Sequence, residues 1–334
     1  MASVGIIGGG AFGTAMACVI RRSGHATTLW AREPYTVAAL NRDGINPLYL
    51  PRVRVEPGII ATNELGQATS DKDFILMVVP AQFLRSVAVQ MHALLAAGTP
   101  VVTCAKGIER GTCALMPEVI AETLPTAKIA VLSGPAFARE VAANLPTGVT
   151  LACADATLGE YLAHEIGTPR FRTYQSDDVI GAAIGGALKN VLAIAAGIAE
   201  GKKLGKNARA TLITCGLLEM ARLGLAKGAR LETFMGLCGI GDLTLTCNNV
   251  QSRNMSLGVA LGEGRSLSEV LGERKEVTEG AYSAEAVAAL ATRLAVDIPI
   301  VAAVDQVLNH GADLDATITG LLAHPYRREG IAAG

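Results

Sequence analysis

This sequence of 334 residues has few aromatic residues and almost no net charge. Phe, Trp and Tyr make up 4% of it, so aliphatic side chains and alanine must build the core, which favours packed helices over an all-β sandwich. Lys and Arg total 29 and Asp and Glu total 30, which leaves a formal net charge of −1. Because proteins that bind nucleic acid through a basic field need clustered Lys and Arg, this balance argues against a nucleic-acid partner.

We also expect no membrane span, and the cysteines are not closely paired. The uncharged stretch Ser86–Ala105 is interrupted by Gln90, His92 and Gly98-Thr99-Pro100, so it falls short of the about 20 predominantly apolar residues of a membrane span. At the N-terminus no basic residue precedes the apolar ones and glycines punctuate them, so we expect neither a signal peptide nor membrane insertion. The seven cysteines form no C-x-x-C pair, which predicts reduced thiols, a cytoplasmic location and no metal site.

Short apolar runs alternate with helical segments over the first part of the chain. The strand candidates are Ser3–Ile7, Ala26–Trp30, Phe74–Val79, Val101–Cys104, Ile129–Leu132 and Thr147–Ala152. Because these runs are apolar without alternation, they are typical of parallel strands buried on both faces. The β-α-β series predicts a doubly wound sheet. The proline-containing segment Asn46–Gly58 is predicted to be a loop.

From about Asp177 the pattern becomes helical. Val179–Glu200 is apolar on nearly all sides, which predicts a buried helix. Further helices are predicted over Ala208–Leu223, Ser283–Leu294, Val301–Leu308 and Asp313–Leu322. The sequence therefore predicts an α/β protein with a sheet domain over 1–180 and an all-helical domain over 181–334.

A glycine-rich turn stands between the first strand and the first helix. Gly8, Gly10 and Gly13 fit the pattern G-x-G-x-x-G, in which small residues let backbone N–H groups and a helix N-terminus approach a pyrophosphate. This placement makes the sheet domain Rossmann-like and predicts dinucleotide binding; the alternative is a tight turn without a ligand. Arg32 follows the second strand and precedes Glu33, which favours NADPH over NADH unless Arg32 is only a solvated surface residue.

Lysines mark two further places where chemistry is expected. Lys106 follows the strand Val101–Cys104 at the edge of the sheet where ligands bind, although a lone lysine there is often merely exposed. Lys189 interrupts the apolar helix just after two glycines, and an unpaired buried lysine is costly. Burial would also lower the pKa of Lys189, as a general acid or base near neutral pH requires. Asp242, in a glycine-rich turn, is the candidate carboxylate partner. The alternatives are a lysine that reaches the surface and an aspartate that serves only the turn.

Ser252, Arg253 and Asn254 open a helical run. Side-chain donors, a guanidinium and backbone N–H groups at a helix start are natural phosphate ligands. Ordinary N-capping by Ser252 is the competing interpretation.

Taken together and in this order, these motifs resemble the NAD(P)-dependent glycerol-3-phosphate dehydrogenases, in particular the bacterial biosynthetic form. The resemblance spans nearly the whole chain and rests on the stretches Gly8–Thr14, Leu29–Arg32, Val79-Pro80, Ala105-Lys106-Gly107, Ser133–Ala138, Leu145-Pro146-Thr147, Gly185–Val191, Gly239–Cys247, Gln251–Asn254 and Val277–Gly280. It implies reversible reduction of dihydroxyacetone phosphate to sn-glycerol 3-phosphate for phospholipid synthesis. Lys189 would then protonate the carbonyl oxygen while NADPH or NADH supplies hydride.

The resemblance also implies a set of site residues. The implied catalytic residues are Lys189 and Asp242, and the implied substrate contacts are these two with Lys106, Gly134, Ala136, Thr246, Ser252, Arg253 and Asn254. The implied cofactor contacts are Gly8, Gly10, Ala11, Phe12, Gly13, Arg32, Tyr49, Lys106, Ala138, Arg253, Val277 and Glu279. Ala11 and Ala136 stand where hydroxyl residues are frequent in the family, so contacts there must come from the backbone.

Three other readings stay open at this point. The chain could be another two-domain reductase of β-hydroxyacids, of the ketopantoate or phosphogluconate type, built on a similar sheet plus helices; the phosphate segment around Arg253 favours a small phosphorylated ketone instead. A sugar-nucleotide dehydrogenase would need a catalytic cysteine, for which Cys215 or Cys247 lack a supporting motif. A regulatory dinucleotide-binding module would not explain the placement of Lys189 and Asp242. The alanine-rich helical domain favours a homodimer on packing grounds.

Overall fold

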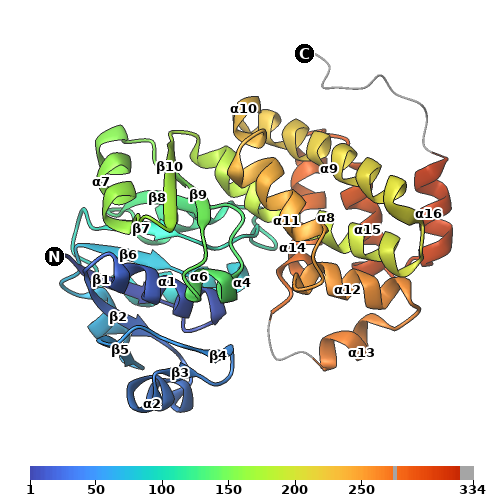
Figure 1. Ribbon diagram of the computed structural model, residues 1–334. Helices are drawn as coiled ribbons and strands as arrows, with labels where there is room; N and C mark the ends of the chain where they lie inside the picture. The colour runs from blue at the N-terminus through green and yellow to red at the C-terminus, as the bar shows by residue number, and fades with distance from the viewer. Residues whose placement is uncertain (274–276, 324–334) are drawn as a thin grey trace. The chain divides into compact units, whose positions relative to one another are not determined.

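The computed structural model describes residues 1–273 and 277–323. Its contacts divide the chain into two compact units (Figure 1). The first comprises Met1–Ala105 and Met116–Val179, and the second comprises Lys106–Leu115 with the chain from Ile180 onward. The division predicted at residue 180 did not foresee that Lys106–Leu115 packs with the helical unit.

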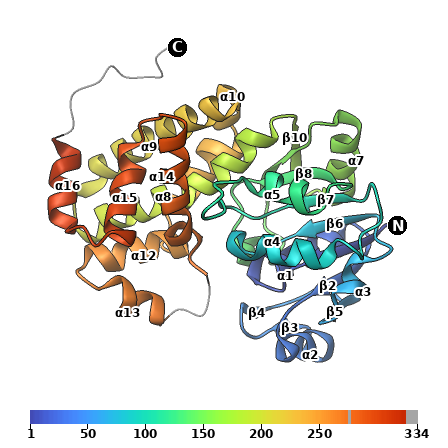
Figure 2. The same ribbon diagram turned by 180° about the vertical axis from the view of Figure 1, so that it is seen from behind.

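The first unit is built on an eight-stranded sheet with the order β10-β9-β8-β7-β6-β1-β2-β5. Its strands are β1 (Ser3–Ile7), β2 (Ala26–Trp30), β5 (Ile59–Thr62), β6 (Phe74–Met77), β7 (Pro100–Thr103), β8 (Lys128–Ser133), β9 (Thr147–Ala152) and β10 (Phe171–Ser176). The helices of this unit are α1 (Ala11–Arg22), α2 (Pro34–Asp43), α3 (Leu65–Thr69), α4 (Ala81–Met91), α5 (Met116–Thr123), α6 (Ala138–Ala142) and α7 (Ala156–Ile166). Figure 1 shows α1, α6 and α7 on the near face of the sheet, and Figure 2 shows α4 and α5 on the opposite face. The doubly wound, Rossmann-like sheet predicted from the sequence is confirmed.

Several details of the strands differ from the prediction, and β5 was not predicted. Strand β9 pairs antiparallel with β8, and β10 pairs parallel with β9, so both run against the other strands. Strand β10 was not predicted because its edge position leaves it polar and largely exposed. The segment predicted as a loop over Asn46–Gly58 contains most of an antiparallel pair, β3 (Ile45–Asn46) with β4 (Leu50–Arg54). Pro51 fits there because a two-stranded pair leaves an edge where its missing N–H costs nothing.

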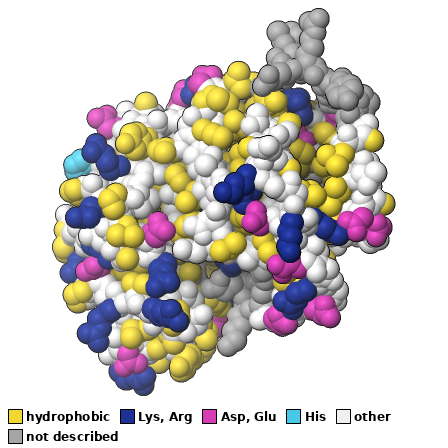
Figure 3. All heavy atoms as spheres, turned by 45° about the vertical axis from the view of Figure 1, so that its right-hand side comes forward, with side chains coloured by type: hydrophobic (Ala, Val, Ile, Leu, Met, Phe, Trp, Pro, Cys, Tyr) yellow, Lys and Arg dark blue, Asp and Glu magenta, His cyan; other side chains and the backbone are white. Residues whose placement is uncertain are grey.

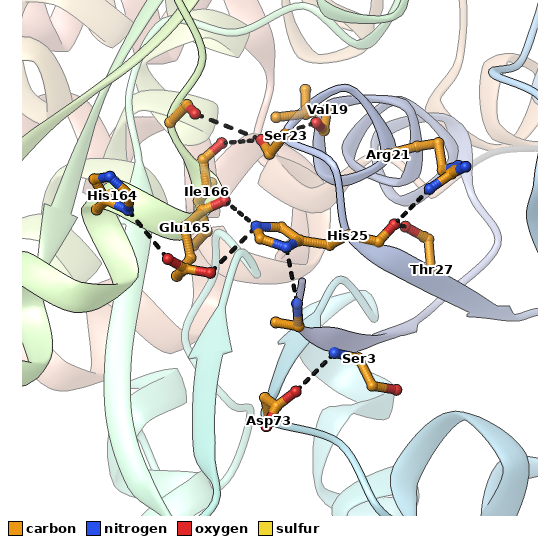
Figure 4. A network of polar contacts seen from close by, with 12 residues as sticks. Ser3, Val19, Arg21, Ser23, His25, Thr27, Asp73, His164, Glu165 and Ile166 are labelled. Atoms are coloured by element: carbon orange, nitrogen blue, oxygen red, sulfur yellow. Dashed lines mark hydrogen bonds and ion pairs between the residues drawn. The ribbon is translucent and has the colours of Figure 1, made fainter.

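His25 anchors the start of β1 to the end of α7 (Figure 4). Its Nδ1 accepts from the Ala2 N–H at 3.2 Å, and its Nε2 lies 2.8 Å from the carbonyl oxygen of Glu165. Nearby, Ser23 Oγ donates to the carbonyl oxygens of Val19 and Ile166 at 3.1 and 3.2 Å. A tautomer with the hydrogen on Nε2 satisfies both ring nitrogens, so this histidine serves the fold.

The second unit is helical. It contains α8 (Val179–Gly201), α9 (Gly205–Lys227), α10 (Leu231–Phe234), the turn η1 (Leu237–Gly241), α11 (Asp242–Cys247), α12 (Arg253–Gly262), α13 (Leu267–Gly272), α14 (Glu279–Arg293), α15 (Pro299–Asn309) and α16 (Leu314–Leu322). Within the described residues, α8 is the one helix long and apolar enough to cross a membrane by length and composition, and 89% of its most apolar window is buried inside the protein. Burial of that extent is typical of a core helix, which meets the same criteria.

Glycines bring α8 and α12 into backbone contact. A Cβ on Gly197 would lie 2.1 Å from the carbonyl oxygen of Met255, and one on Gly258 would lie 2.0 Å from that of Ile194. Gly201 and Gly262 repeat this arrangement one turn further along, with Cβ distances of 2.3 and 2.6 Å to the carbonyl oxygens of Val259 and Ile198. No larger residue fits at these positions unless the helices separate.

The surface of the helical unit pairs charges of opposite sign. Arg265 contacts Glu273, Lys202 contacts Asp315 and Arg209 contacts Glu200, each at 2.6 Å. On the face in Figure 3, basic and acidic side chains likewise lie near one another. Such exposed pairs contribute little to stability.

A buried carboxylate holds the start of α15. Glu219 of α9 is 1% exposed and accepts from the N–H groups of Ile300 and Val301 at 2.7 and 3.1 Å. Burial raises the pKa of Glu219 from 4.5 to about 7, although the two backbone N–H groups and Arg222 oppose the rise. Because the folded protein holds the proton of Glu219 more tightly than the unfolded chain does, the protonated group stabilises the fold. This stabilisation is complete below the ordinary pKa of 4.5 and is lost as the pH rises through about 7.

We expect Glu219→Gln to remove this pH dependence. Between about pH 5 and about pH 8 the free energy of unfolding of the unmodified protein should fall relative to that of the variant by roughly 3 kcal/mol at most. Urea unfolding of both proteins at the two pH values measures the difference. Parallel curves would show that Glu219 keeps the same charge across this range.

Candidate active site

The turn between β1 and α1 forms an open cradle of backbone. Gly8 has φ +124°, and its Cβ would lie 2.6 Å from the Val78 carbonyl oxygen. A Cβ on Gly13 would lie 1.8 Å from the Gly8 carbonyl oxygen, whereas one on Gly10 meets nothing within 4 Å. Gly8 and Gly13 are therefore required by packing, and Gly10 leaves space above the helix start.

Backbone N–H donors at the start of α1 face that space. Gly10 occupies the N-cap position without a side-chain cap, and the Thr14 N–H is bonded to the Gly10 carbonyl at 2.9 Å. The N–H groups of Ala11, Phe12 and Gly13 come before that bond, and N–H groups at a helix start stabilise an anion. The cradle fits the pyrophosphate of a dinucleotide.

Asn46 holds this cradle and was missed from the sequence. It is fully buried, and its Nδ2 donates to the Gly9 carbonyl oxygen and to Thr14 Oγ1, each at 2.8 Å. Its Oδ1 accepts from the Tyr49 N–H at 3.1 Å. An asparagine in a proline-rich segment gives no signal of its own, because Gly9 and Thr14, which it holds, are more than 30 residues away.

Arg32 and Tyr49 both lie beside Glu33. Arg32 Nη2 contacts Glu33 Oε1 at 3.1 Å, and the Tyr49 hydroxyl lies 3.4 Å from the same oxygen. The Arg32 side chain is 78% exposed. The arginine is therefore accessible to a ligand at the end of β2, as an arginine that binds a 2′-phosphate must be.

The matched pair Gly10→Ala and Gly13→Ala tests the cradle. We expect Gly10→Ala to keep the thermal midpoint of the unmodified protein and to weaken NADPH binding about tenfold. The new methyl group touches no protein atom and occupies only space that the ligand would fill. Gly13→Ala should instead lower the thermal midpoint. Unchanged NADPH affinity in a folded Gly10→Ala variant would rule out the cradle as the binding site.

The turn after β8 is the other predicted element of the sheet unit. Gly134 has φ +148°, and its Cβ would lie 3.0 Å from Val149 Cα. Ala136 and Ala138 are partly buried against the core of the sheet unit, and α6 starts at Ala138. The backbone of this turn fixes where any ligand contact at these positions must be made.

A buried carboxylate joins two lysines in the helical unit. Asp242 is fully buried, and its Oδ1 accepts from Lys189 Nζ at 2.7 Å while its Oδ2 accepts from Lys106 Nζ at 2.6 Å. Lys189 also donates to Thr246 Oγ1 at 3.0 Å, and Thr246 donates to the Asp242 carbonyl oxygen at 2.6 Å. The structure thus brings together four of the predicted residues, and Lys189 is 8% exposed.

Burial and charge act in opposite directions on this cluster. Burial lowers the pKa of Lys189 from 10.5 to about 8; Asp242 opposes this shift and the charge of Lys106 adds to it. Burial alone would raise the pKa of Asp242, but the two ammonium groups hold it below its usual range. The cluster therefore keeps Asp242 ionised and provides a lysine that exchanges a proton near neutral pH.

Glycines position both partners. A Cβ on Gly185 would lie 2.2 Å from the Cys238 carbonyl oxygen, so α8 touches the backbone of η1 one helical turn before Lys189. In η1 itself Gly239 takes φ −100° and ψ −105°, and its Cβ would lie 2.1 Å from the Phe234 carbonyl oxygen. The close approach at Gly185 brings Asp242 to Lys189.

Two carboxamides connect this cluster to the start of α14. Asn190 Nδ2 donates to the Lys106 carbonyl oxygen at 3.1 Å, and its Oδ1 accepts from Asn254 Nδ2 at 2.9 Å. Asn254 Oδ1 in turn accepts from the Gly280 N–H at 2.9 Å. Asn190 was not predicted to have a role, although its position next to Lys189 was a signal.

The segment predicted to bind phosphate opens α12. Ser252 caps the helix, its Oγ accepting from the Met255 N–H at 3.2 Å. Arg253 is exposed and donates to the Val277 carbonyl oxygen at 2.8 Å, while Glu279 begins α14. N-capping by Ser252 is therefore present, and phosphate binding by the segment stays a prediction.

The mostly parallel sheet with its glycine cradle and the buried lysine–carboxylate cluster are typical of a nicotinamide-dependent oxidoreductase. Family models for the NAD-dependent glycerol-3-phosphate dehydrogenase N-terminus and C-terminus match residues 3–159 and 178–319. A glycerol-3-phosphate dehydrogenase [NAD(P)+] of Rhodospirillum rubrum is 54% identical over 98% of this chain and 94% of its own length. The chain belongs to the NAD-dependent glycerol-3-phosphate dehydrogenase family.

Solved structures agree with this assignment. The crystal structure of glycerol-3-phosphate dehydrogenase from Coxiella burnetii matches with a TM-score of 0.93 and 40% identity, covering 97% of this chain and 99% of that one. A ketopantoate reductase from Ralstonia eutropha matches with a TM-score of 0.63 and 17% identity over 95% of this chain and 99% of its own. That likeness shows the fold alone, so the ketopantoate-type reading gains no support beyond it.

Proposed function

We propose that this protein catalyses the reversible NAD(P)H-dependent reduction of dihydroxyacetone phosphate to sn-glycerol 3-phosphate. Membership of the family supports this activity, and one observation supports the chemistry. Two of the three ammonium hydrogens of Lys189 are engaged by Asp242 and Thr246, which leaves the third to donate to a carbonyl oxygen. The lysine is thus oriented by fixed partners before any substrate arrives.

These contacts support the proposed roles of the residues in the helical unit. When bound, the nicotinamide cofactor supplies the hydride that reduces the carbonyl carbon. Lys189 Nζ donates a proton to the carbonyl oxygen during reduction and withdraws it from the alcohol during oxidation. Asp242 offsets the charge of the ammonium form, and Lys106 brings a second cation for a phosphorylated substrate. Ser252, Arg253 and Asn254 are proposed to bind the substrate phosphate, with Gly134 and Ala136 contacting the substrate through their backbone.

We expect opposite pH dependence in the two directions, and loss of both on Lys189→Met. Because Lys189 has a pKa of about 8, kcat for reduction should fall above this pH, where the lysine loses its proton. Oxidation needs the neutral amine, so its kcat should rise over the same range. Lys189→Met should lower kcat at least about a thousandfold, measured from NADPH absorbance.

Lys202→Met is the matched control, since it removes a lysine from the exposed pair with Asp315. That variant should keep both kcat and its pH profile. Lys189→Met should still bind NADPH, as followed by cofactor fluorescence. Turnover near that of the unmodified protein in Lys189→Met would contradict the assignment.

NADPH is proposed as the preferred cofactor, with NADH also accepted. Arg32 is the cation at the end of β2, and Ala11, Phe12, Tyr49 and Ala138 are proposed cofactor contacts in the sheet unit. Lys106, Arg253, Val277 and Glu279 are those proposed in the helical unit. Glu33 lies between Arg32 and Tyr49, so it offsets part of the arginine charge and leaves NADH acceptable.

Arg32→Ala should therefore reduce the preference for NADPH. We expect kcat/KM with NADPH to fall about tenfold and that with NADH to change less than twofold, because only NADPH carries the 2′-phosphate. Steady-state assays with both cofactors measure the ratio. Equal losses with the two cofactors would place Arg32 outside the 2′-phosphate site.

We also propose that the protein acts as a homodimer in the cytoplasm, where it supplies glycerophospholipid synthesis. The alanine-rich helical unit supports the homodimer, and the absence of a C-x-x-C pair in the sequence supports the cytoplasmic location.

A further inference from the structure

The segment that carries Lys106 belongs to the helical core. It follows β7 in the chain, yet Ile108, Cys113 and Leu115 are buried in the same apolar cluster as α8 and α14. All three side chains are at most 4% exposed. Besides the hydrogen bond from Asn190 to its carbonyl oxygen, the position of Lys106 therefore depends on how this loop, Lys106–Leu115, is held by the helices.

The loop has a defined shape of its own. Ile108 and Leu115 form a β-bridge, and the Glu109 N–H donates to the Ala114 carbonyl oxygen at 3.0 Å. Thr112 Oγ1 donates to Glu109 Oε2 at 2.6 Å. A closed loop with internal hydrogen bonds moves as one piece, so contacts at its tip act on Lys106 at its start.

Helix α14 contacts the loop at two places. At its last turn, Arg293 donates to the carbonyl oxygens of Thr112 and Gly111 at 2.7 and 2.9 Å. Further back along the helix, Glu285 accepts from Arg110 Nε at 2.7 Å, and the Arg110 guanidinium lies 5.9 Å from the centre of the Tyr282 ring. Arg293 is exposed, and its planar guanidinium fixes the direction of both hydrogen bonds.

We propose that Arg293 is a positioning residue that, aided by the Arg110–Glu285 pair, holds Lys106 Nζ against Asp242 Oδ2. The inference rests on the proposed function, in which Lys106 and Lys189 share this carboxylate. With the loop anchored, Asp242 is divided between the two lysines. If the loop loosens, Lys106 withdraws and Asp242 pairs with Lys189 alone.

Loosening the loop has a consequence that simple destabilisation does not have. The charge of Lys106 lowers the pKa of Lys189, so withdrawal of Lys106 should raise it. The alkaline limb of kcat for reduction then moves to higher pH. KM for dihydroxyacetone phosphate rises at the same time, because a cation has left the site.

The test combines Arg293→Met and Lys106→Met in a double-mutant cycle. We expect Arg293→Met to lower kcat/KM for dihydroxyacetone phosphate about tenfold and to move the alkaline limb upward. In the Lys106→Met background the same change should have less than a twofold effect, because its target is gone. Arg293→Lys should restore part of the loss. Equal effects of Arg293→Met in both backgrounds would overturn the proposal.

Arg265→Met is the matched control, since it breaks an exposed Arg–Glu pair that lies outside the loop. It should leave kcat/KM and the pH profile unchanged. A change in Arg265→Met equal to that in Arg293→Met would show a general effect of losing a surface arginine, and would also overturn the proposal.

A measurement without substrate separates this inference from the proposed function. Cys113 is buried and Cys215 is exposed, so the rate at which a thiol reagent modifies each can be followed by peptide mass spectrometry. Arg293→Met should speed modification of Cys113 at least about fivefold while Cys238 and Cys247 of the helical unit stay protected. Unchanged Cys113 protection would overturn the anchoring, whereas failure of the unmodified protein to reduce dihydroxyacetone phosphate would overturn only the proposed function.

Discussion

The helical site depends on one buried carboxylate that two lysines share. Two ammonium groups and one carboxylate leave an excess positive charge in a place with little access to water, and such a charge is costly unless an anion offsets it. A phosphorylated substrate provides that anion. Burial lowers the pKa of Lys189 to about 8 in spite of Asp242, and the charge of Lys106 adds to this shift. Affinity for an anion and a proton available near neutral pH thus come from one arrangement.

Glycine has three different uses in this chain. At Gly8 and Gly13 a side chain would collide with backbone, at Gly197 and Gly258 it would separate two helices, and at Gly10 it would meet only open space. A pattern of glycines in the sequence cannot distinguish these uses, because each depends on what lies opposite. Only the last use marks a surface that a ligand can approach.

Much of the architecture followed from local pattern, and the exceptions share one cause. Lys189 was identified because a charge inside an apolar helix needs a partner. The predicted direction of β9 was wrong, because the apolar pattern of a strand is the same whichever way the strand runs. Asn46 and Arg293 were missed, because their partners lie far away in the chain, 181 residues apart in the case of Arg293 and Thr112. Sequence patterns report periodicity, whereas these contacts are set by packing.

The register of α8 explains why a helix that is apolar on nearly every side carries two adjacent polar residues. Gly185 and Lys189 are four residues apart and therefore lie on one face, which meets η1 and Asp242. Asn190, Ile194, Gly197 and Gly201 follow at spacings of three or four and form a second face, which meets α12 and Asn254. Neither polar residue can move along the helix without leaving its partner, because a shift of one position turns the side chain by about 100°. The two helix faces therefore fix the positions of Lys189 and Asn190 together.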